Sequence, residues 1–91
     1  MERRIGFVGI LLEDRSGAAE VNAVLAANQP LILARVGLPM RDTEAGAPAA
    51  VITLVVEATT DEMGALAGRL GKINGVSVKS ALAKRTKGGE A

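Results

Sequence analysis

Two strand–helix–strand units follow one another in this 91-residue chain, and that order restricts the folds open to it. The first unit has two apolar segments of strand length, RIGFVGILL (4–12) and LILARVGLPMR (31–41), with small and apolar residues at helical spacing between them. The second unit repeats the order with AAVITLVVEA (49–58), a helical segment and a short alternating strand from Val76. Right-handed crossovers and short connections then favour a ferredoxin-like βαββαβ sandwich.

This topology makes specific demands on the four strands. All four form one antiparallel sheet in the order 4-1-3-2, and both helices cover the same face. The first and third strands are therefore central, and these two segments are apolar at odd and even positions alike, as expected of strands buried on both faces. Pro39 has no backbone N–H to donate, so the second strand should be an edge strand or end at a bulge. We predict an α+β domain of this topology over residues 1–85, followed by a disordered tail at 86–91.

Short polar side chains indicate where the two helices begin. Asp14 or Ser16 is expected to cap the first helix, because its side-chain oxygen can accept from N–H groups left free at a helix start. The second helix is expected to start within TTD (59–61) and contains three glycines in GALAGRLG (64–71). Each glycine weakens the helix by about 1 kcal/mol relative to alanine. They either permit close approach of a neighbouring element or are simply tolerated.

The face of the sheet without helices is expected to be apolar. Val51 and Val55 of the third strand would lie on it. The first strand would add one of two sets, either Ile5, Phe7 and Leu11 or Val8, Ile10 and Leu12, and the sequence does not choose between them. A large exposed apolar surface typically marks an interface, and a small aliphatic domain gains stability from a partner subunit. We expect a homo-oligomer, a dimer or tetramer, formed through the sheet; the alternative is a C-terminal tail folded over this face.

The composition argues against several kinds of chemistry. The chain contains no His, Cys, Trp or Tyr, whereas soft or borderline metal sites and Ser–His or Cys nucleophiles depend on His or Cys. The glycine spacings match neither a dinucleotide-binding nor a phosphate-binding loop. We therefore expect no enzyme activity, no metal and no cofactor. RNA-recognition domains of the same topology stack bases on aromatic residues, and Phe7 is the sole aromatic residue here, so direct nucleic-acid binding is not expected.

The first fifteen residues superficially resemble a signal peptide, with basic residues before an apolar run. Glu13, Asp14 and Arg15 end that run, and no small-residue cleavage site follows. No other segment approaches the length of a transmembrane helix. The absence of cysteine fits a reducing compartment. We expect a cytoplasmic protein without membrane association.

Several stretches of the chain resemble one small family. LLEDR, AAEVNAVL, ILARVGLPMR and MGALAGRLGKINGVSVKSALAKR are similar to the proposed regulators of the iron-only hydrogenase system, over roughly residues 4–85. The strongest matches are Glu13-Asp14-Arg15, Val21-Asn22, Arg35-Val36-Gly37, Pro39, Arg41, Gly64-Ala65-Leu66, Gly68, Leu70-Gly71 and Gly75-Val76. The family is ACT-like and is related in fold to the ligand-sensing C-terminal domain of the nickel-responsive regulator and to acetolactate synthase regulatory subunits.

The resemblance implies a stand-alone ACT-like regulatory domain from an anaerobic bacterium. Such a domain would act as an oligomer that senses a small ligand or binds a protein partner. The alternative is an amino-acid-sensing subunit similar to the regulatory subunit of acetolactate synthase. Nickel sensing is not implied, because the nickel-responsive regulator binds its metal through His and Cys, which this chain lacks.

A ligand site is expected where the first strand meets the first helix, next to a subunit interface. Arg35 and Arg41 have the same strand parity and together could bind an anion, because a guanidinium fork fits a carboxylate or phosphate. Glu13 and Asp14, followed by Arg15, could accept an amine. The alternative is that the arginines pair with surface acids and that the acids cap a helix.

Overall fold

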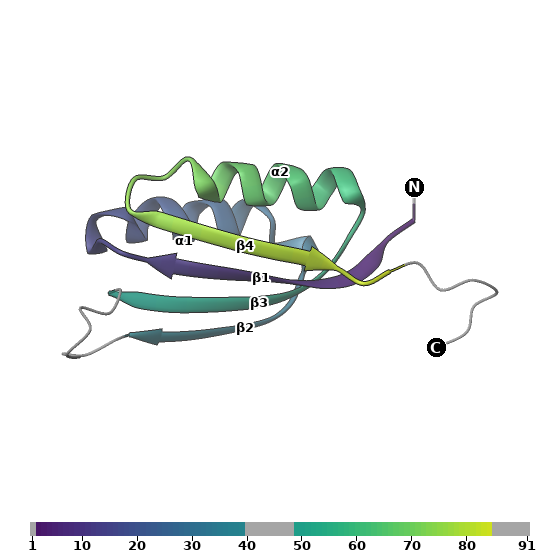
Figure 1. The fold of residues 1–91 in the computed structure, drawn as a ribbon, viewed down its shortest axis with the longest axis horizontal. Coiled ribbons are helices and arrows are strands. Elements are labelled where there is room, and N and C mark those ends of the chain that lie inside the picture. The colour runs from purple at the N-terminus through teal and green to yellow at the C-terminus, as the bar shows by residue number, and fades with distance from the viewer. Residues whose placement is uncertain (1, 40–48, 85–91) are drawn as a thin grey trace.

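The computed structural model describes residues 2–39 and 49–84. Its elements follow the predicted order, and Figure 1 shows them as one sheet with two helices above it. They are β1 (Arg4–Leu12), α1 (Ala18–Ala27), β2 (Ile32–Pro39), β3 (Ala50–Ala58), α2 (Thr60–Gly71) and β4 (Val76–Leu82), with 3-10 turns at Arg15–Gly17 and Gln29–Leu31. The strand order is β2-β3-β1-β4 and every pairing is antiparallel. The predicted ferredoxin-like α+β fold is confirmed.

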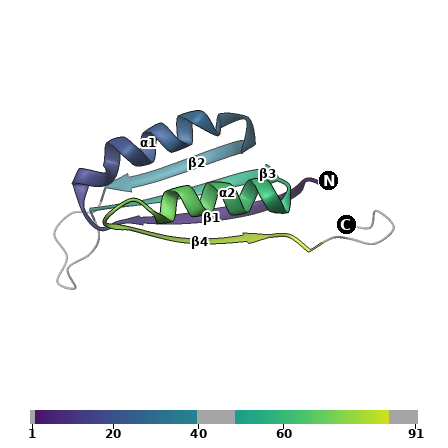
Figure 2. The ribbon, with the colours of Figure 1, turned by 90° about the horizontal axis from the view of Figure 1, so that it is seen from above.

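Both helices lie on one face of the sheet, as Figures 1 and 2 show. The core beneath them is entirely aliphatic apart from one methionine, and no buried polar or charged residue is found in the described part of the chain. Its members are Val8, Ile10, Leu12, Val21, Leu25, Leu31, Ile52, Leu54, Val56, Ala58, Met63, Leu66, Leu70 and Ile73. The structure thus settles the facing of β1: its even-numbered residues from Val8 to Leu12 pack under the helices, and Ile5, Phe7 and Leu11 face the other way.

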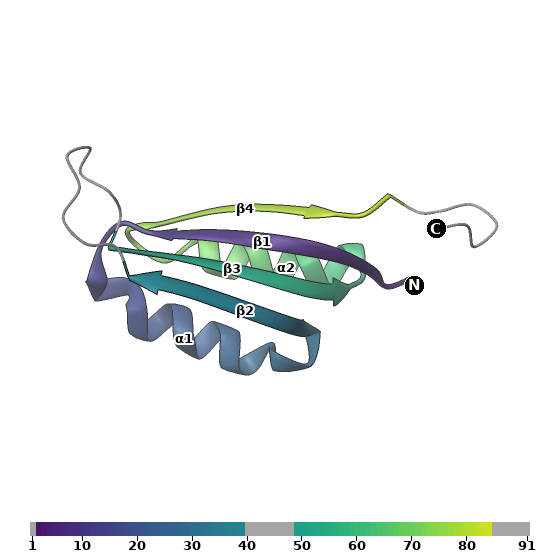
Figure 3. The same cartoon turned by 90° about the horizontal axis from the view of Figure 1, so that it is seen from below.

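The edge position of β2 is confirmed, with Pro39 as its last residue. A register shift between Ile32 and Ala34 interrupts its pairing with β3. Helix α1 lies over the outer side of β2 in the views from above and below, so it covers this edge less completely than α2 covers the centre (Figures 2 and 3). Most of β2 is consequently exposed.

The first helix begins in two steps. Asp14 accepts from the N–H of Ser16 at 3.0 Å and so caps the 3-10 turn Arg15–Gly17, not α1 itself. The turn leads directly into α1, whose first residue is Ala18 and whose N-cap position is Gly17, without a side-chain cap. The predicted capping by Asp14 is therefore correct for the turn, and the α-helix starts later than that cap suggested.

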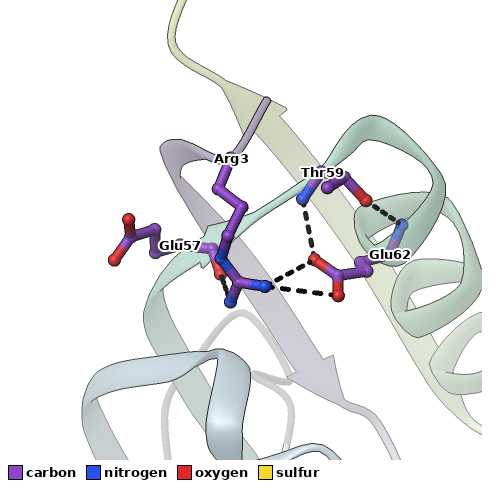
Figure 4. Close-up of polar contacts among 4 residues, drawn as sticks. All are labelled: Arg3, Glu57, Thr59 and Glu62. Atoms are coloured by element: carbon purple, nitrogen blue, oxygen red, sulfur yellow. Dashed lines mark hydrogen bonds and ion pairs between the residues drawn. The ribbon is translucent and has the colours of Figure 1, made fainter. Parts of the chain in front are cut away.

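Thr59 caps the second helix in a reciprocal arrangement. Its hydroxyl accepts from the N–H of Glu62 at 3.1 Å, and the Glu62 carboxylate accepts from the N–H of Thr59 at 2.9 Å. Figure 4 shows that Arg3 completes this cluster: its guanidinium lies 3.3 Å from Glu62 and donates to the main-chain oxygen of Glu57 at 2.9 Å. The N-terminal segment is thereby joined to the start of α2.

The turn at Asn74-Gly75 packs against the turn that follows β1. The N–H of Glu13 donates to the carbonyl oxygen of Gly75 at 2.6 Å, and Gly75 has a positive φ of 77°. A Cβ atom at this position would lie 2.9 Å from Cβ of Asp14. Glycine therefore lets the two turns meet closely, next to the junction of β1 and the first helix.

The three glycines of α2 have a different explanation. A Cβ atom added at Gly64, Gly68 or Gly71 would meet nothing within 4 Å. Within the described residues they permit no close approach, so of the two interpretations given above the structure favours simple tolerance. The tail predicted for 86–91 lies outside the described residues, and the extent of the domain to residue 85 remains a prediction.

Candidate functional site

The helix-free face of the sheet, called the open face below, carries six of the seven exposed large apolar side chains of the described chain. It carries the odd-numbered residues of β1, β3 and β4 and, after the register shift in β2, the even-numbered residues from Ala34 to Leu38, because these alternate with the residues that face the helices. Its large apolar side chains are between 38% (Val55) and 60% (Val36) exposed. They are Ile5, Phe7 and Leu11 of β1, Val36 and Leu38 of β2, and Val55 of β3.

Phe7 lies at the centre of the open face. It pairs with Val55 on one side and with Ala81 on the other, and both pairs place apolar atoms next to the ring. An apolar hollow of about 380 Å³ lies beside it, lined by residues of β1, β3 and the end of β4. A ring that projects from a sheet next to a hollow is a shape that a second, identical surface can complement.

Two charged residues lie on opposite sides of Phe7. Lys79 of β4 is paired with Gly9, two residues beyond Phe7 along β1. Glu57 of β3 is paired with Ile5, two residues before Phe7. In the register of the sheet, Phe7 is thus the midpoint between a positive and a negative charge.

A second feature lies on the helix side, between α1 and β2. A cavity of about 240 Å³ is lined by apolar residues together with Asn22 of α1 and Arg35 of β2. The guanidinium of Arg35 donates to the side-chain oxygen of Asn22 at 2.9 Å. The lining residues are Leu12, Ala18, Val21, Asn22, Arg35, Gly37, Leu38, Pro39, Ala50 and Ile52.

The polar residues predicted to form one ligand site do not come together at this cavity. Glu13, Asp14 and Arg15 do not line this cavity, although all three are exposed at the end of β1 and in the following turn. The Asp14 carboxylate is occupied by the N–H of Ser16, and this hydrogen bond lowers the pKa of Asp14. Arg41, expected to act with Arg35, lies outside the described residues.

Asn22 was not among the predicted site residues. It occupies the same helical stripe as Val21 and Leu25, which are buried, and it reaches across to the strand. A polar residue at an otherwise apolar helical position was the available signal, because such a residue needs a hydrogen-bond partner or solvent.

The fold and these surfaces together define a small ferredoxin-like α+β domain with an apolar open face. A family model described as TM1266-like, proposed regulators of the iron-only hydrogenase system, matches residues 4–80. The chain belongs to this family.

Two solved structures are similar to the chain. Uncharacterized protein TM1266 from Thermotoga maritima is 39% identical, with a TM-score of 0.79, over 91% of this chain and 100% of that one. CPII, a nitrogen regulatory PII-like protein from Thiomonas intermedia K12 whose structure contains ADP, AMP and bicarbonate, is 13% identical with a TM-score of 0.44, over 92% and 96% of the two chains. No curated protein matches the chain.

The described residues also set limits on other kinds of site. None of the helices in the ranges 2–39 and 49–84 is long and apolar enough to cross a membrane. Within the same ranges, no three His, Cys, Asp or Glu side chains are grouped so that they could hold a metal ion.

Proposed function

We propose that this protein is a stand-alone regulatory domain of the iron-only hydrogenase system that acts as a homo-oligomer, and that it senses a small ligand or binds a protein partner. The apolar open face is the observation that carries the proposal. Membership of a family of proposed regulators supports the regulatory role. The proposal includes a cytoplasmic location, which a cysteine-free composition suits.

The size of the open face fits a contact between two copies. Strands spaced about 4.8 Å apart with a rise of about 3.3 Å per residue give a four-stranded, nine-residue sheet a face of roughly 600 Å². Two such faces pressed together bury about 1,200 Å², the lower end of standard protein–protein interfaces. Burial at about 25 cal/mol per Å² of apolar area would offset much of the cost of association. A tetramer would require a second surface in addition.

The register of charges favours a two-fold arrangement centred on Phe7. A two-fold contact is isologous, so each residue pair across it occurs twice. Because Phe7 is the midpoint between Glu57 and Lys79, an axis in the interface plane through Phe7 can place Lys79 of one copy against Glu57 of the other, and the reverse. The two Phe7 rings then meet at the centre. The proposed dimer therefore has an apolar centre and two reciprocal ion pairs.

Sedimentation equilibrium of charge-reversed variants at micromolar concentration tests this dimer. Lys79→Glu and Glu57→Lys should each weaken dimerisation by tenfold or more, because each creates two like-charge contacts. The double variant should recover most of the wild-type affinity. Glu20→Lys on α1 and Lys72→Glu at the end of α2 are matched controls with the same changes of charge, since both residues are exposed outside the open face. A wild-type monomer, or a double variant no better than the single ones, would refute the arrangement.

A further inference from the structure

The cavity between α1 and β2 combines an apolar wall with one cationic residue among those described. Leu12, Val21 and Ile52 form much of the wall and belong to the core, so the inner surface is fixed by packing. Arg35 also lines the cavity and is exposed. The lining therefore suits a molecule with an apolar body and a single polar head.

The guanidinium of Arg35 is held in place without an acidic partner among the described residues. Its hydrogen bond goes to the uncharged amide oxygen of Asn22, and the described part of the chain shows no ion pair of Arg35. A guanidinium has five N–H donors in a planar fork that matches a carboxylate. Asn22 fixes the position of the fork on one side, and no other residue in the ranges 2–39 and 49–84 accepts from the remaining donors, which can bind an anion.

The size and charge of the cavity further restrict the class of molecule that could bind there. A volume of about 240 Å³ is below the range of about 300–1,000 Å³ typical of sites for drug-sized ligands, so the ligand is small. Among the described residues, no Asp or Glu lines this cavity or the adjoining hollow formed by Asn22, Leu25, Ala26, Gln29, Ile32 and Arg35. An ammonium group would therefore be desolvated there without an opposite charge, which is costly.

We infer that this cavity binds a short branched aliphatic monocarboxylate, with its carboxylate on Arg35 and its alkyl chain against Val21 and Ile52, in preference to the amino acid of the same skeleton. The inference deepens the proposed regulatory function, on which its physiological meaning rests, by naming an effector class and a site. It also separates this chain from the amino-acid-sensing alternative.

Two probes with one carbon skeleton test the preference: 4-methylpentanoate and leucine, its 2-amino derivative. Amide chemical shifts of the full chain are followed during titration with each. We expect 4-methylpentanoate to shift amides of α1 and β2 and to bind at least tenfold more tightly than leucine. Equal or tighter binding of leucine, shifts confined to other elements, or no binding of either probe at about 10 mM would overturn the inference.

Variants of two lining residues test the position of the ligand. Arg35→Gln should weaken binding at least tenfold, because it removes a charge-assisted hydrogen bond; Arg15→Gln, an exposed arginine outside the lining, should leave it unchanged. Gly37→Val should abolish binding by filling the cavity. A Cβ atom at Gly37 would meet Cγ1 of Ile52 at 3.8 Å, an ordinary contact, so the fold should persist with an unchanged or higher melting temperature. Wild-type affinity in Arg35→Gln or in folded Gly37→Val would refute the site.

Sedimentation of the same samples distinguishes this inference from the dimer proposal. A dimer that binds neither probe overturns the ligand site and leaves the dimer intact. A monomer that binds 4-methylpentanoate through Arg35 overturns the dimer and leaves the site intact.

Discussion

Replacing Gly75 by alanine tests whether the close contact between two turns supports the fold. Gly75 has a φ of 77°, and its carbonyl oxygen accepts from the N–H of Glu13 at 2.6 Å. The left-handed conformation costs an alanine roughly 1–2 kcal/mol. The added Cβ would also lie 2.9 Å from Cβ of Asp14, closer than such atoms normally approach, so one of the turns must move.

The magnitude follows from adding these two effects. Displacing a well-packed neighbour typically costs about 1–3 kcal/mol, so together with the cost of the left-handed conformation Gly75→Ala should lower the free energy of unfolding by about 2–5 kcal/mol. Gly64→Ala is the matched control, because it adds the same methyl group to an exposed helical position with nothing within 4 Å. That variant should raise the free energy of unfolding by about 1 kcal/mol.

Urea unfolding followed by circular dichroism measures both changes. All variants must be compared at one protein concentration, because association would make the apparent stability depend on concentration. In a thermal melt, about 1 kcal/mol corresponds to about 4–8 °C for a domain of this size. A Gly75→Ala variant as stable as the wild type would show that the turn does not have the left-handed geometry, and a destabilised Gly64→Ala variant would show that α2 packs against something on that side.

Three further changes test other parts of the structure. Leu54→Ala removes a fully buried side chain from the central strand β3 and should cost about 2–5 kcal/mol in urea unfolding; a loss below 1 kcal/mol would mean that the core is not packed as described. Arg3→Ala should cost less than about 1 kcal/mol, because its ion pair with Glu62 is exposed to solvent, and a larger loss would show that the N-terminal segment stabilises more than the start of α2. A hydrogen bond from the backbone N–H of Ser16 lowers the pKa of Asp14 in the folded protein. The Asp14 carboxylate therefore stabilises the fold above the ordinary aspartate pKa, and this stabilisation is lost as the pH falls through the lower pKa of the folded state. Asp14→Asn keeps the cap without the charge and should flatten that acid-side dependence in stability measured from pH 5 to 2; an unchanged slope would refute the assignment.

The order of the elements could be predicted because each depends mainly on local sequence. The periods of the apolar residues and the turn residues identify four strands and two helices, and chirality with short connections leaves few topologies for that order. The central position of β1 and β3 agrees with segments that carry apolar residues at both odd and even positions, since an edge strand has less surface to bury. The capping of α2 was predictable as well, because Thr59 and Glu62 have the spacing of a capping box.

The candidate sites were less accessible to sequence reasoning. Arg35 was predicted as an anion ligand, but its partner Asn22 lies thirteen residues away, and their contact depends on how α1 lies over β2. Glu13, Asp14 and Arg15 are adjacent in sequence and were grouped for that reason. The structure shows the Asp14 carboxylate engaged by the turn that it caps. The pairing of Arg35 with Arg41 stays a prediction.

The sequence by itself determined the class of fold, the strand order and the apolar character of both faces of the sheet. Tertiary structure alone decided which residues of β1 meet the helices, because the two alternating sets are similarly apolar and a shift of one residue exchanges them. That choice left Phe7 on the open face between Glu57 and Lys79. The alternation of side chains along a strand shows only that neighbouring residues face opposite sides of the sheet. Which set packs under the helices depends on how Val8 and Ile10 fit against helices distant in the chain.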